Sequence, residues 1–250
     1  MAELEVLVPA KNPDGLCGVD EAGRGPVLGP LVVVGIRTQD DGPFRDIGVK
    51  DSKKCTPELR ERLGPQIRRF CEHVVVRVIP ADRIDSLRRR MTMNELEAEV
   101  FADIIRGLLT SRFPSGRTPG SIRVYVDAAD ANAHTFKQRI LRHLNTRIDL
   151  VSEHKADVRY PVVAAASILA KLIRDEEMRK ISKELGEEVG SGYPSDPVTR
   201  AYIEKAAGSN GSLPPHTRKS WETVRLYLKK DHKLNEYEEA SGEESQGADE

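Results

Sequence analysis

The start of the chain restricts the fold more than any other stretch of it. Residues 16–25 begin with apolar side chains and become rich in glycine, and a β-branched run follows at 27–36. Two such runs separated by glycines are typical of two strands joined by a turn. We therefore predict a hairpin-like pair of strands that is joined near residues 23–26.

Helices and strands alternate in the rest of the sequence. Thr56 followed by Pro57 is an N-cap residue with proline at the first helical position, and residues 93–109 repeat apolar side chains every four positions, as one face of a helix does. The predicted elements are helices at 56–69, 93–109, 136–144, 161–185 and 198–206, strands at 73–79, 122–126 and 148–152, and an amphipathic stretch at 221–229. The order strand, helix, strand indicates parallel strands with a crossover helix, so we expect an α/β fold.

The length and the cysteines limit the class of protein. The 250 residues suffice for one well-packed core and a small appended unit. The apolar runs at 30–36 and 161–170 are shorter than the roughly 18 residues that a membrane-spanning helix needs, and the first residues lack the features of a secretory signal. Three cysteines without a C-x-x-C pair support neither a disulfide framework nor a structural zinc. We expect a cytoplasmic protein that does not contact a membrane.

The charge of the chain is uneven. Its formal net charge is −1, but residues 231–250 hold 8 acidic residues and 1 lysine, which leaves a net charge of about +6 on the remainder. A modestly basic body fits nucleic acid as a partner, although ordinary solvated surface charge explains so small an excess as well. The acidic end has too little apolar surface to offset the entropy of ordering, and we expect it to be disordered.

Four acidic residues stand at the ends of predicted elements. Asp20 and Glu21 end the first strand, Asp127 ends a later one, and Asp157 precedes the long helix. The carboxyl ends of parallel strands lie at one edge of a sheet, so these acids could meet there. Clustered carboxylates repel each other unless cations intervene, and two Mg²⁺ or Mn²⁺ ions would balance them and could support phosphodiester cleavage. Taken singly, each acid could instead be an ordinary cap, turn residue or ion-pair partner.

The glycine-rich turn beside the first two acids allows several interpretations. Gly23, Gly25 and Gly29 have the spacing G-x-G-x-x-x-G and precede a β-branched run, whereas a dinucleotide fingerprint is G-x-G-x-x-G and opens a helix. A dinucleotide site is therefore disfavoured. The turn could bring bare backbone close to a ligand, with Arg24 offering charge to a phosphate, or it could be a plain tight turn.

Five segments, in this order, resemble the type 2 ribonucleases H, specifically archaeal ribonuclease HII. They are GVDEAGRGPVLGPLVV at 18–33, DSKK at 51–54, VYVDAADAN at 124–132, EHKADVRYPVVAAASILAK at 153–171 and SGYPSDP at 191–197. The resemblance implies a ribonuclease H-like fold with a mixed five-stranded sheet flanked by helices. It also implies a catalytic domain over 14–190, a small helical carboxy-terminal subdomain over 191–232 and an acidic tail over 233–250.

The resemblance also implies an activity and a site. Such enzymes hydrolyse the RNA strand of RNA–DNA hybrids and cut 5′ of ribonucleotides embedded in duplex DNA, leaving 3′-hydroxyl and 5′-phosphate ends. The family's catalytic and metal-binding acids match Asp20, Glu21, Asp127 and Asp157, which would hold two divalent ions, Mg²⁺ or Mn²⁺. The residues that match its substrate contacts are Gly23, Arg24 and Gly25 at the 2′-hydroxyl, Tyr193 on the next sugar, and Lys53, Ser167 and Lys171 at phosphates.

Other interpretations remain open at this point. Ser167 could serve helix packing instead of binding phosphate, and Trp221 is better explained as an anchor for the last helix than as a base-stacking platform. The sister ribonuclease HIII lacks the glycine-arginine-glycine turn, and a binding protein with a vestigial site has no reason to keep clustered charge. The acidic end lacks the glutamine-and-aromatic motif with which some archaeal relatives bind the sliding clamp, which argues against clamp binding, and we expect a monomer.

Overall fold

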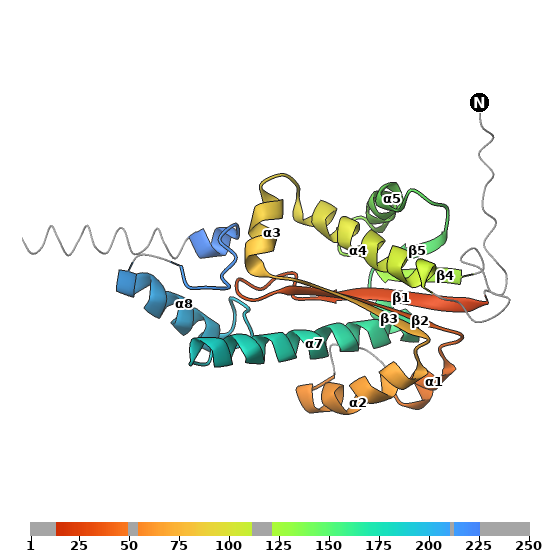
Figure 1. The fold of residues 1–250 in the computed structure, drawn as a ribbon, viewed down its shortest axis with the longest axis horizontal. Helices are drawn as coiled ribbons and strands as arrows, with labels where there is room; N and C mark the ends of the chain where they lie inside the picture. Colours follow the sequence, from red (N-terminus) through yellow and green to blue (C-terminus); the bar gives the residue numbers. More distant parts are fainter. Residues whose placement is uncertain (1–13, 50–54, 112–121, 211–212, 226–250) are drawn as a thin grey trace, which may run out of the picture. The chain divides into compact units, whose positions relative to one another are not determined.

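A computed structural model describes residues 14–49, 55–111, 122–210 and 213–225 of the chain (Figure 1). The described residues divide into two compact units: those within 14–24, 31–79 and 90–175 form the first, and those within 25–30, 80–89 and 176–225 form the second. The strands are β1 (Gly15–Ala22), β2 (Leu31–Thr38), β3 (His73–Ile79), β4 (Ile122–Asp127) and β5 (Asp149–Glu153). The helices are α1 (Gly42–Asp46), α2 (Pro57–Phe70), α3 (Ala81–Arg88), α4 (Met93–Thr110), α5 (Ala133–Leu144), α6 (Ala156–Arg159), α7 (Pro161–Leu185) and α8 (Pro197–Asn210).

All five strands form one mixed sheet in the order β3-β2-β1-β4-β5. β1 and β2 are antiparallel, as are β2 and β3, whereas β1, β4 and β5 run parallel to one another. Val19 of β1 pairs with Val126 of β4, so Asp20 and Asp127 are the next residues at the same edge of the sheet. The predicted mixed five-stranded sheet flanked by helices is confirmed. Its carboxyl edge carries three of the four acids that the sequence singled out, namely Asp20, Glu21 and Asp127.

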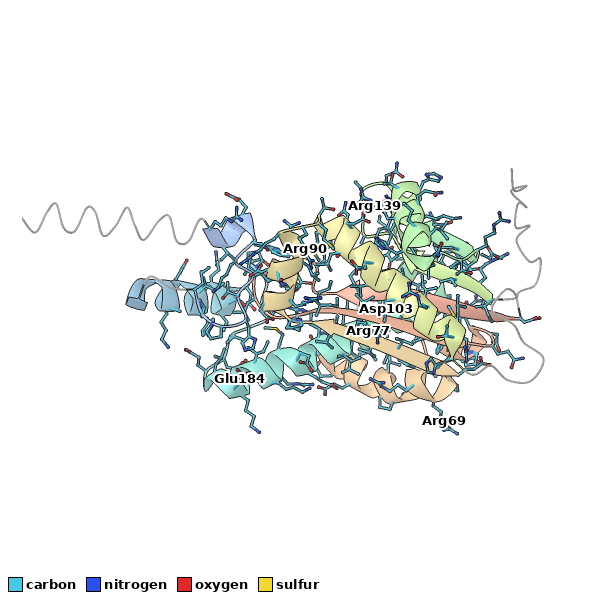
Figure 2. The ribbon with its side chains drawn as sticks, turned by 45° about the horizontal axis from the view of Figure 1, so that its top comes forward. Arg69, Arg77, Arg90, Asp103, Arg139 and Glu184 are labelled. Carbon is cyan, nitrogen blue, oxygen red and sulfur yellow. The ribbon has the colours of Figure 1, made fainter. Side chains whose placement is uncertain are left out.

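Helices α4 and α5 cover one face of this sheet (Figure 1). At Gly35 of β2 a Cβ atom would overlap Ile104 and would lie 2.9 Å from Leu108 Cδ1, so this strand approaches α4 closely. Phe101 and Phe136 join α4 to α5 through an edge-to-face contact with ring centroids 5.2 Å apart. Figure 2 shows the exposed Arg77 of β3 beside Asp103 of α4, with Nε 2.6 Å from Oδ2.

Helices α1, α2 and the first part of α7 cover the opposite face (Figure 1). Val32, Val34 and Ile36 of β2 share a buried apolar cluster with α2 and with the alanine-rich run of α7. At Gly18 of β1 a Cβ atom would overlap the carbonyl of Val162, so strand and helix backbones are in direct contact here. The absence of a side chain at Gly18 allows this approach, which fixes β1 against the helix.

The second unit has an apolar core of its own. Val27, Leu28 and the later part of α7 pack with α8 and Val224. The side chain of Arg218 is wholly buried, and its Nε donates to the carbonyl of Gly29 at 2.9 Å. Trp221 packs against this core, with the guanidinium of Arg218 4.9 Å from its ring centroid. The tryptophan thus serves as an anchor inside the second unit, as the sequence suggested.

Most predicted elements occur within a few residues of their expected bounds, and three differences have local causes. The second strand begins at Leu31 instead of residue 27, because the backbone amides of Val27 and Leu28 both donate to the carbonyl of Gly192. Helix α3 was not predicted, because it buries only Ala81 and Ile84 and its other positions, apart from Leu87, are polar. The short α1 and α6 were missed as well.

Two sequence expectations are left as predictions. The first is the boundary between a catalytic domain at 14–190 and a subdomain at 191–232. The two compact units of the structure instead divide α7 after residue 175. Of the amphipathic stretch at 221–229, the structure describes residues up to 225. Across the described part of the chain, none of the helices combines the length and the apolar character that crossing a membrane requires.

Candidate active site

Three elements of the first unit carry the four acids. Asp20 and Glu21 lie at the end of β1, Asp127 is the last residue of β4, and Asp157 lies in the short helix α6. Asp20 and Asp157 are each only 4% exposed. The backbone amide of Ala156 donates to Oδ1 of Asp127 at 3.0 Å, which ties the start of α6 to the end of β4.

The carboxylates at the end of β1 lie in an environment that opposes their charge. Burial raises the pKa of Asp20 well above its usual value, and the neighbouring Glu21 and Asp127 raise it further. The pKa of Glu21 is raised as well, by burial first and by Asp127 second. Two acids with raised pKa values beside a third make this edge of the sheet a place that favours a cation.

Ser167 and Lys171 of α7 support one of these acids. Lys171 Nζ donates to Ser167 Oγ at 2.9 Å, and a hydrogen bond from Ser167 together with the charge of Lys171 lowers the pKa of Asp20, which partly opposes the effect of burial. Ser167 is only 1% exposed. Ser167 therefore contacts the acid cluster, whereas Lys171 acts on it through its charge and through Ser167. A contact of either residue with a phosphate group stays a prediction.

The donor set fits hard divalent cations. Carboxylate oxygens are ligands that Mg²⁺ and Mn²⁺ prefer, and Oε2 of Glu21 is buried with no hydrogen-bond partner among the described residues. Within the same residues, no three His, Cys, Asp or Glu side chains are yet close enough together to enclose an ion. The cysteines add no softer ligands: Cys17 and Cys55 are buried, and burial raises the pKa of the Cys17 thiol to about 12.

The glycine turn begins at Gly23, two residues after Glu21. Gly23 has a φ of +90°, a conformation that side-chain-bearing residues rarely adopt. The side chain of Arg24 is directed towards α4: its Nη2 donates to Asn94 Oδ1 at 2.6 Å and its Nη1 forms an ion pair with Glu97. The structure thus gives the guanidinium partners inside the protein, whereas the sequence had suggested a phosphate.

Gly25 and Tyr193 are neighbours within the second unit. A Cβ atom built on Gly25 would lie 3.7 Å from Cε1 of Tyr193, which is an ordinary contact. The tyrosine is 40% exposed, so an aromatic face is open to solvent next to a bare stretch of backbone. Lys53, the remaining predicted substrate contact, lies outside the described residues.

Sequence reasoning missed Glu97 and Asn94. Glu97 is completely buried on α4, between the buried Leu96 and Ala98. An acid within an apolar helix face was visible in the sequence, and it requires a partner by the same argument that singled out the acids at the strand ends. Its partner Arg24 is 73 positions away, so local patterns could not have revealed the pair.

The strand order and the flanking helices define the class: this is a ribonuclease H-like fold, with acids at the carboxyl edge of its sheet. A family model, Ribonuclease HII, matches residues 17–224. Ribonuclease HII of Pyrococcus furiosus is 44% identical over 210 residues, which are 83% of this chain and 88% of that protein. The chain belongs to the ribonuclease HII family and is a type 2 ribonuclease H, a nuclease.

Solved structures agree with this assignment. The ribonuclease H2 from Pyrococcus horikoshii OT3 superposes with a TM-score of 0.75 and 40% identity, covering 88% of this chain and 99% of that one. The structure of the PCNA:RNase HII complex from Archaeoglobus fulgidus matches with a TM-score of 0.72 and 36% identity, covering 83% of this chain and 95% of that one. The resemblance seen in the sequence motifs is confirmed over most of the chain.

Proposed function

We propose that this chain is a divalent-metal-dependent endoribonuclease that hydrolyses the RNA strand of RNA–DNA hybrids. We further propose that it cuts 5′ of ribonucleotides embedded in duplex DNA and leaves 3′-hydroxyl and 5′-phosphate ends. The observation that supports this most directly is the group of buried, mutually repelling acids at the carboxyl edge of the sheet. Such an arrangement opposes folding in the absence of cations, so a role in binding them is its simplest physical reason.

The metal-binding residues in this proposal are Asp20, Glu21, Asp127 and Asp157. Two divalent ions, Mg²⁺ or Mn²⁺, would supply Lewis acidity that activates a water molecule and stabilises the leaving 3′ oxygen. The protein's own residues would hold the acids in place. Ser167 and Lys171 orient Asp20 from α7, and the amide of Ala156 orients Asp127.

Substrate recognition would combine the glycine turn with the exposed tyrosine. The backbone of Gly23, Arg24 and Gly25 would contact the 2′-hydroxyl, which is the group that distinguishes RNA from DNA. Tyr193 would stack on the sugar of the following deoxynucleotide. Its 40% exposure and its position beside Gly25 support this assignment. Lys53 would contact a phosphate of the substrate. Lys171 and Ser167 would also contact a phosphate if the substrate drew their side chains away from Asp20.

Partners and location remain proposals of the same kind. The relative from Archaeoglobus fulgidus has been solved in complex with PCNA. For this chain, the expectation against clamp binding rests on the missing glutamine-and-aromatic motif in its acidic end. We propose that it acts on nucleic acid as a monomer in the cytoplasm.

A DNA duplex that contains one ribonucleotide tests the function. The protein is incubated with this duplex in Mg²⁺ and in EDTA, and the products are sized against a ladder. We expect a Mg²⁺-dependent cut 5′ of the ribonucleotide, and we expect Asp127→Asn to abolish it while duplex binding persists. Cleavage of a long RNA–DNA hybrid without cleavage at the single ribonucleotide would refute the junction-reading role of the turn and Tyr193. Binding without turnover on either substrate would refute the enzymatic proposal.

A further inference from the structure

The first turns of α4 contact the glycine turn through a buried charge. Glu97 has no solvent exposure, and its carboxylate pairs with Arg24. Asn94, one turn earlier on the same helix, accepts a hydrogen bond of 2.6 Å from the other terminal nitrogen of Arg24. A planar guanidinium that binds two acceptors at once has its position and its orientation fixed. These two residues of α4 therefore determine where the side chain of Arg24 lies.

The two neighbours of Arg24 give this contact its importance. Gly23 and Gly25 flank the arginine, and glycine imposes little backbone preference of its own. A turn made of Gly-Arg-Gly is therefore not held in one conformation by its own sequence, even though Gly23 adopts a φ of +90°. The side chain of Arg24 is held from outside the turn, by Asn94 and Glu97 of α4.

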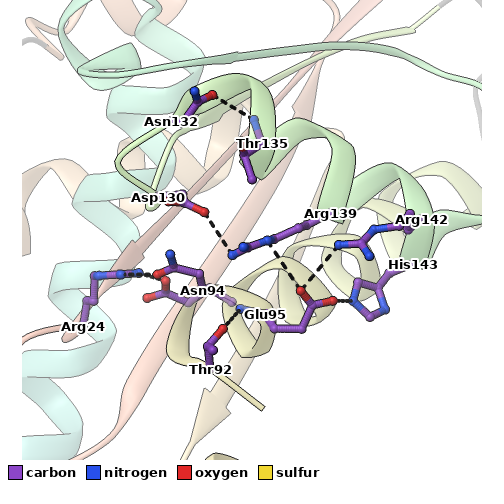
Figure 3. Close-up of polar contacts among 11 residues, drawn as sticks. Arg24, Thr92, Asn94, Glu95, Asp130, Asn132, Thr135, Arg139, Arg142 and His143 are labelled. Carbon is purple, nitrogen blue, oxygen red and sulfur yellow. Dashed lines mark hydrogen bonds and ion pairs between the residues drawn. The ribbon is translucent and has the colours of Figure 1, made fainter.

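The same end of α4 also reaches the loop that follows Asp127 (Figure 3). Glu95 contacts Nε2 of His143 at 2.8 Å and lies 3.5 Å from Nε of Arg139. Arg139 in turn forms an ion pair with Asp130, with Nη1 3.0 Å from Oδ2. Asp130 comes three residues after Asp127. One helix end is thus connected both to the turn after Glu21 and to the loop after the acid of β4.

We propose that Glu97 and Asn94 are positioning residues for ribonucleotide recognition, acting through Arg24 to set the backbone of the Gly23-Arg24-Gly25 turn. The proposal rests on the proposed function, since it concerns how the 2′-hydroxyl is read. It assigns the guanidinium to the protein interior and leaves recognition to the backbone on either side of it. A displacement of that backbone by about 1 Å would be expected to lower cleavage by up to about a hundredfold.

A purely structural role for the ion pair is the competing explanation. A buried pair loses stability when one partner is removed, but replacement of both partners by apolar residues of similar volume is often neutral. The double variant Arg24→Met/Glu97→Met therefore separates the two explanations. If the pair only stabilises the fold, this variant recovers both the melting temperature and the activity. If the pair positions the turn, it recovers the melting temperature alone.

The experiment uses the full chain and two duplexes that differ only in one ribonucleotide. Cleavage of the ribonucleotide duplex is followed in Mg²⁺ to obtain kcat and KM, and the affinity for both duplexes is measured by fluorescence anisotropy in an Asp127→Asn background. The variants are Glu97→Gln, Asn94→Ala and the double methionine variant. Glu99→Gln is the matched control, because Glu99 is an exposed acid two positions further along α4.

We expect the double variant to melt like the wild type, while its preference for the ribonucleotide duplex and its kcat/KM fall about tenfold or more. Its affinity for the all-DNA duplex should stay unchanged, as should every property of Glu99→Gln. Wild-type preference and activity in the double variant would overturn the proposal. If that variant does not regain stability, Asn94→Ala decides, because it leaves the buried pair intact: an undiminished ribonucleotide preference there would also overturn the proposal. Failure of the wild type to cut would instead refute the proposed function.

Discussion

Two glycines near the site should respond to the same substitution in opposite ways. The change is Gly25→Ala in the turn, compared with Gly18→Ala in β1. At Gly25 the new methyl group would lie 3.7 Å from Tyr193 Cε1 with no closer neighbour, and Gly25 is not among the residues with positive φ. At Gly18 it would overlap the carbonyl of Val162 and lie 2.8 Å from Val163 N, where only backbone atoms could move away.

The magnitudes follow from these contacts. An alanine that fits its backbone conformation stabilises a protein by about 0.4–1 kcal/mol, because the unfolded chain loses entropy. Overpacking costs about 1–3 kcal/mol, and a backbone obstacle places Gly18→Ala at the upper end of that range. For a chain of this size about 1 kcal/mol corresponds to about 2–4 °C in Tm. Gly25→Ala should therefore melt up to about 4 °C higher than the wild type, and Gly18→Ala about 6–12 °C lower.

The activities of the two variants should rank in the opposite order to their melting temperatures. If bare backbone at Gly25 must approach the 2′-hydroxyl, a methyl group there should lower kcat/KM on the single-ribonucleotide duplex by about a hundredfold. Gly18→Ala, assayed well below its melting temperature, should retain the larger share of activity. Differential scanning calorimetry and the duplex assay measure the two properties. Wild-type cleavage by a stable Gly25→Ala variant would refute the idea that the ligand approaches this backbone.

Three further predictions concern the acid cluster. In EDTA, Asp20→Asn should raise the free energy of unfolding by about 1–4 kcal/mol, which is the Coulomb energy of one like-charge contact at about 4 Å. The same variant should gain less thermal stability from Mn²⁺ than the wild type does. A variant that is less stable than the wild type in EDTA would contradict the assigned repulsion. The raised pKa values of Asp20 and Glu21 mean that the folded chain binds more protons than the unfolded one between the ordinary and the raised values. Their contribution to stability in EDTA should thus be complete below about pH 4 and be lost as the pH rises through the raised values. Urea titrations at several pH values measure the free energy of unfolding of the wild type and of Asp20→Asn. A difference between the two that does not change with pH would contradict this prediction. Ser167→Ala removes a hydrogen bond that orients Asp20 and should weaken Mn²⁺ affinity by about 10–100-fold in calorimetric titration, whereas unchanged affinity would assign Ser167 to helix packing.

The parts of the fold that sequence could predict are those with local signals. The cap at Thr56 accepts from the amide of Leu59 at 3.3 Å, and helix α2 begins at Pro57 as expected. The strand at 73–79 has the predicted bounds. Helix α3 lacked such signals, because its residues are mostly polar and only two are buried.

The residues of the site also differ in whether a local sequence pattern could reveal them. Asp20, Glu21 and Asp127 could be identified because they end apolar runs, and strand topology then brings Asp20 and Asp127 to one edge. Asp157 was identified by its position before the long helix. The direction of the Arg24 side chain could not be predicted, because it depends on where α4 packs against the sheet. The interaction of Ser167 with Asp20 likewise depends on contact between α7 and β1, which are far apart in sequence.

The contact between β1 and α7 has a consequence for protein engineering. Gly18, two residues before Asp20, meets the backbone of Val162, five residues before Ser167, without any intervening side chain. Aliphatic residues elsewhere in the core can be exchanged for others of different shape. The spacing between β1 and α7 at Gly18 does not depend on the rotamers of these residues, because backbone meets backbone there. Libraries that vary Val32, Val34 and Ile36 while keeping Gly18 should therefore yield enzymes of altered thermal tolerance whose acid cluster keeps its dimensions.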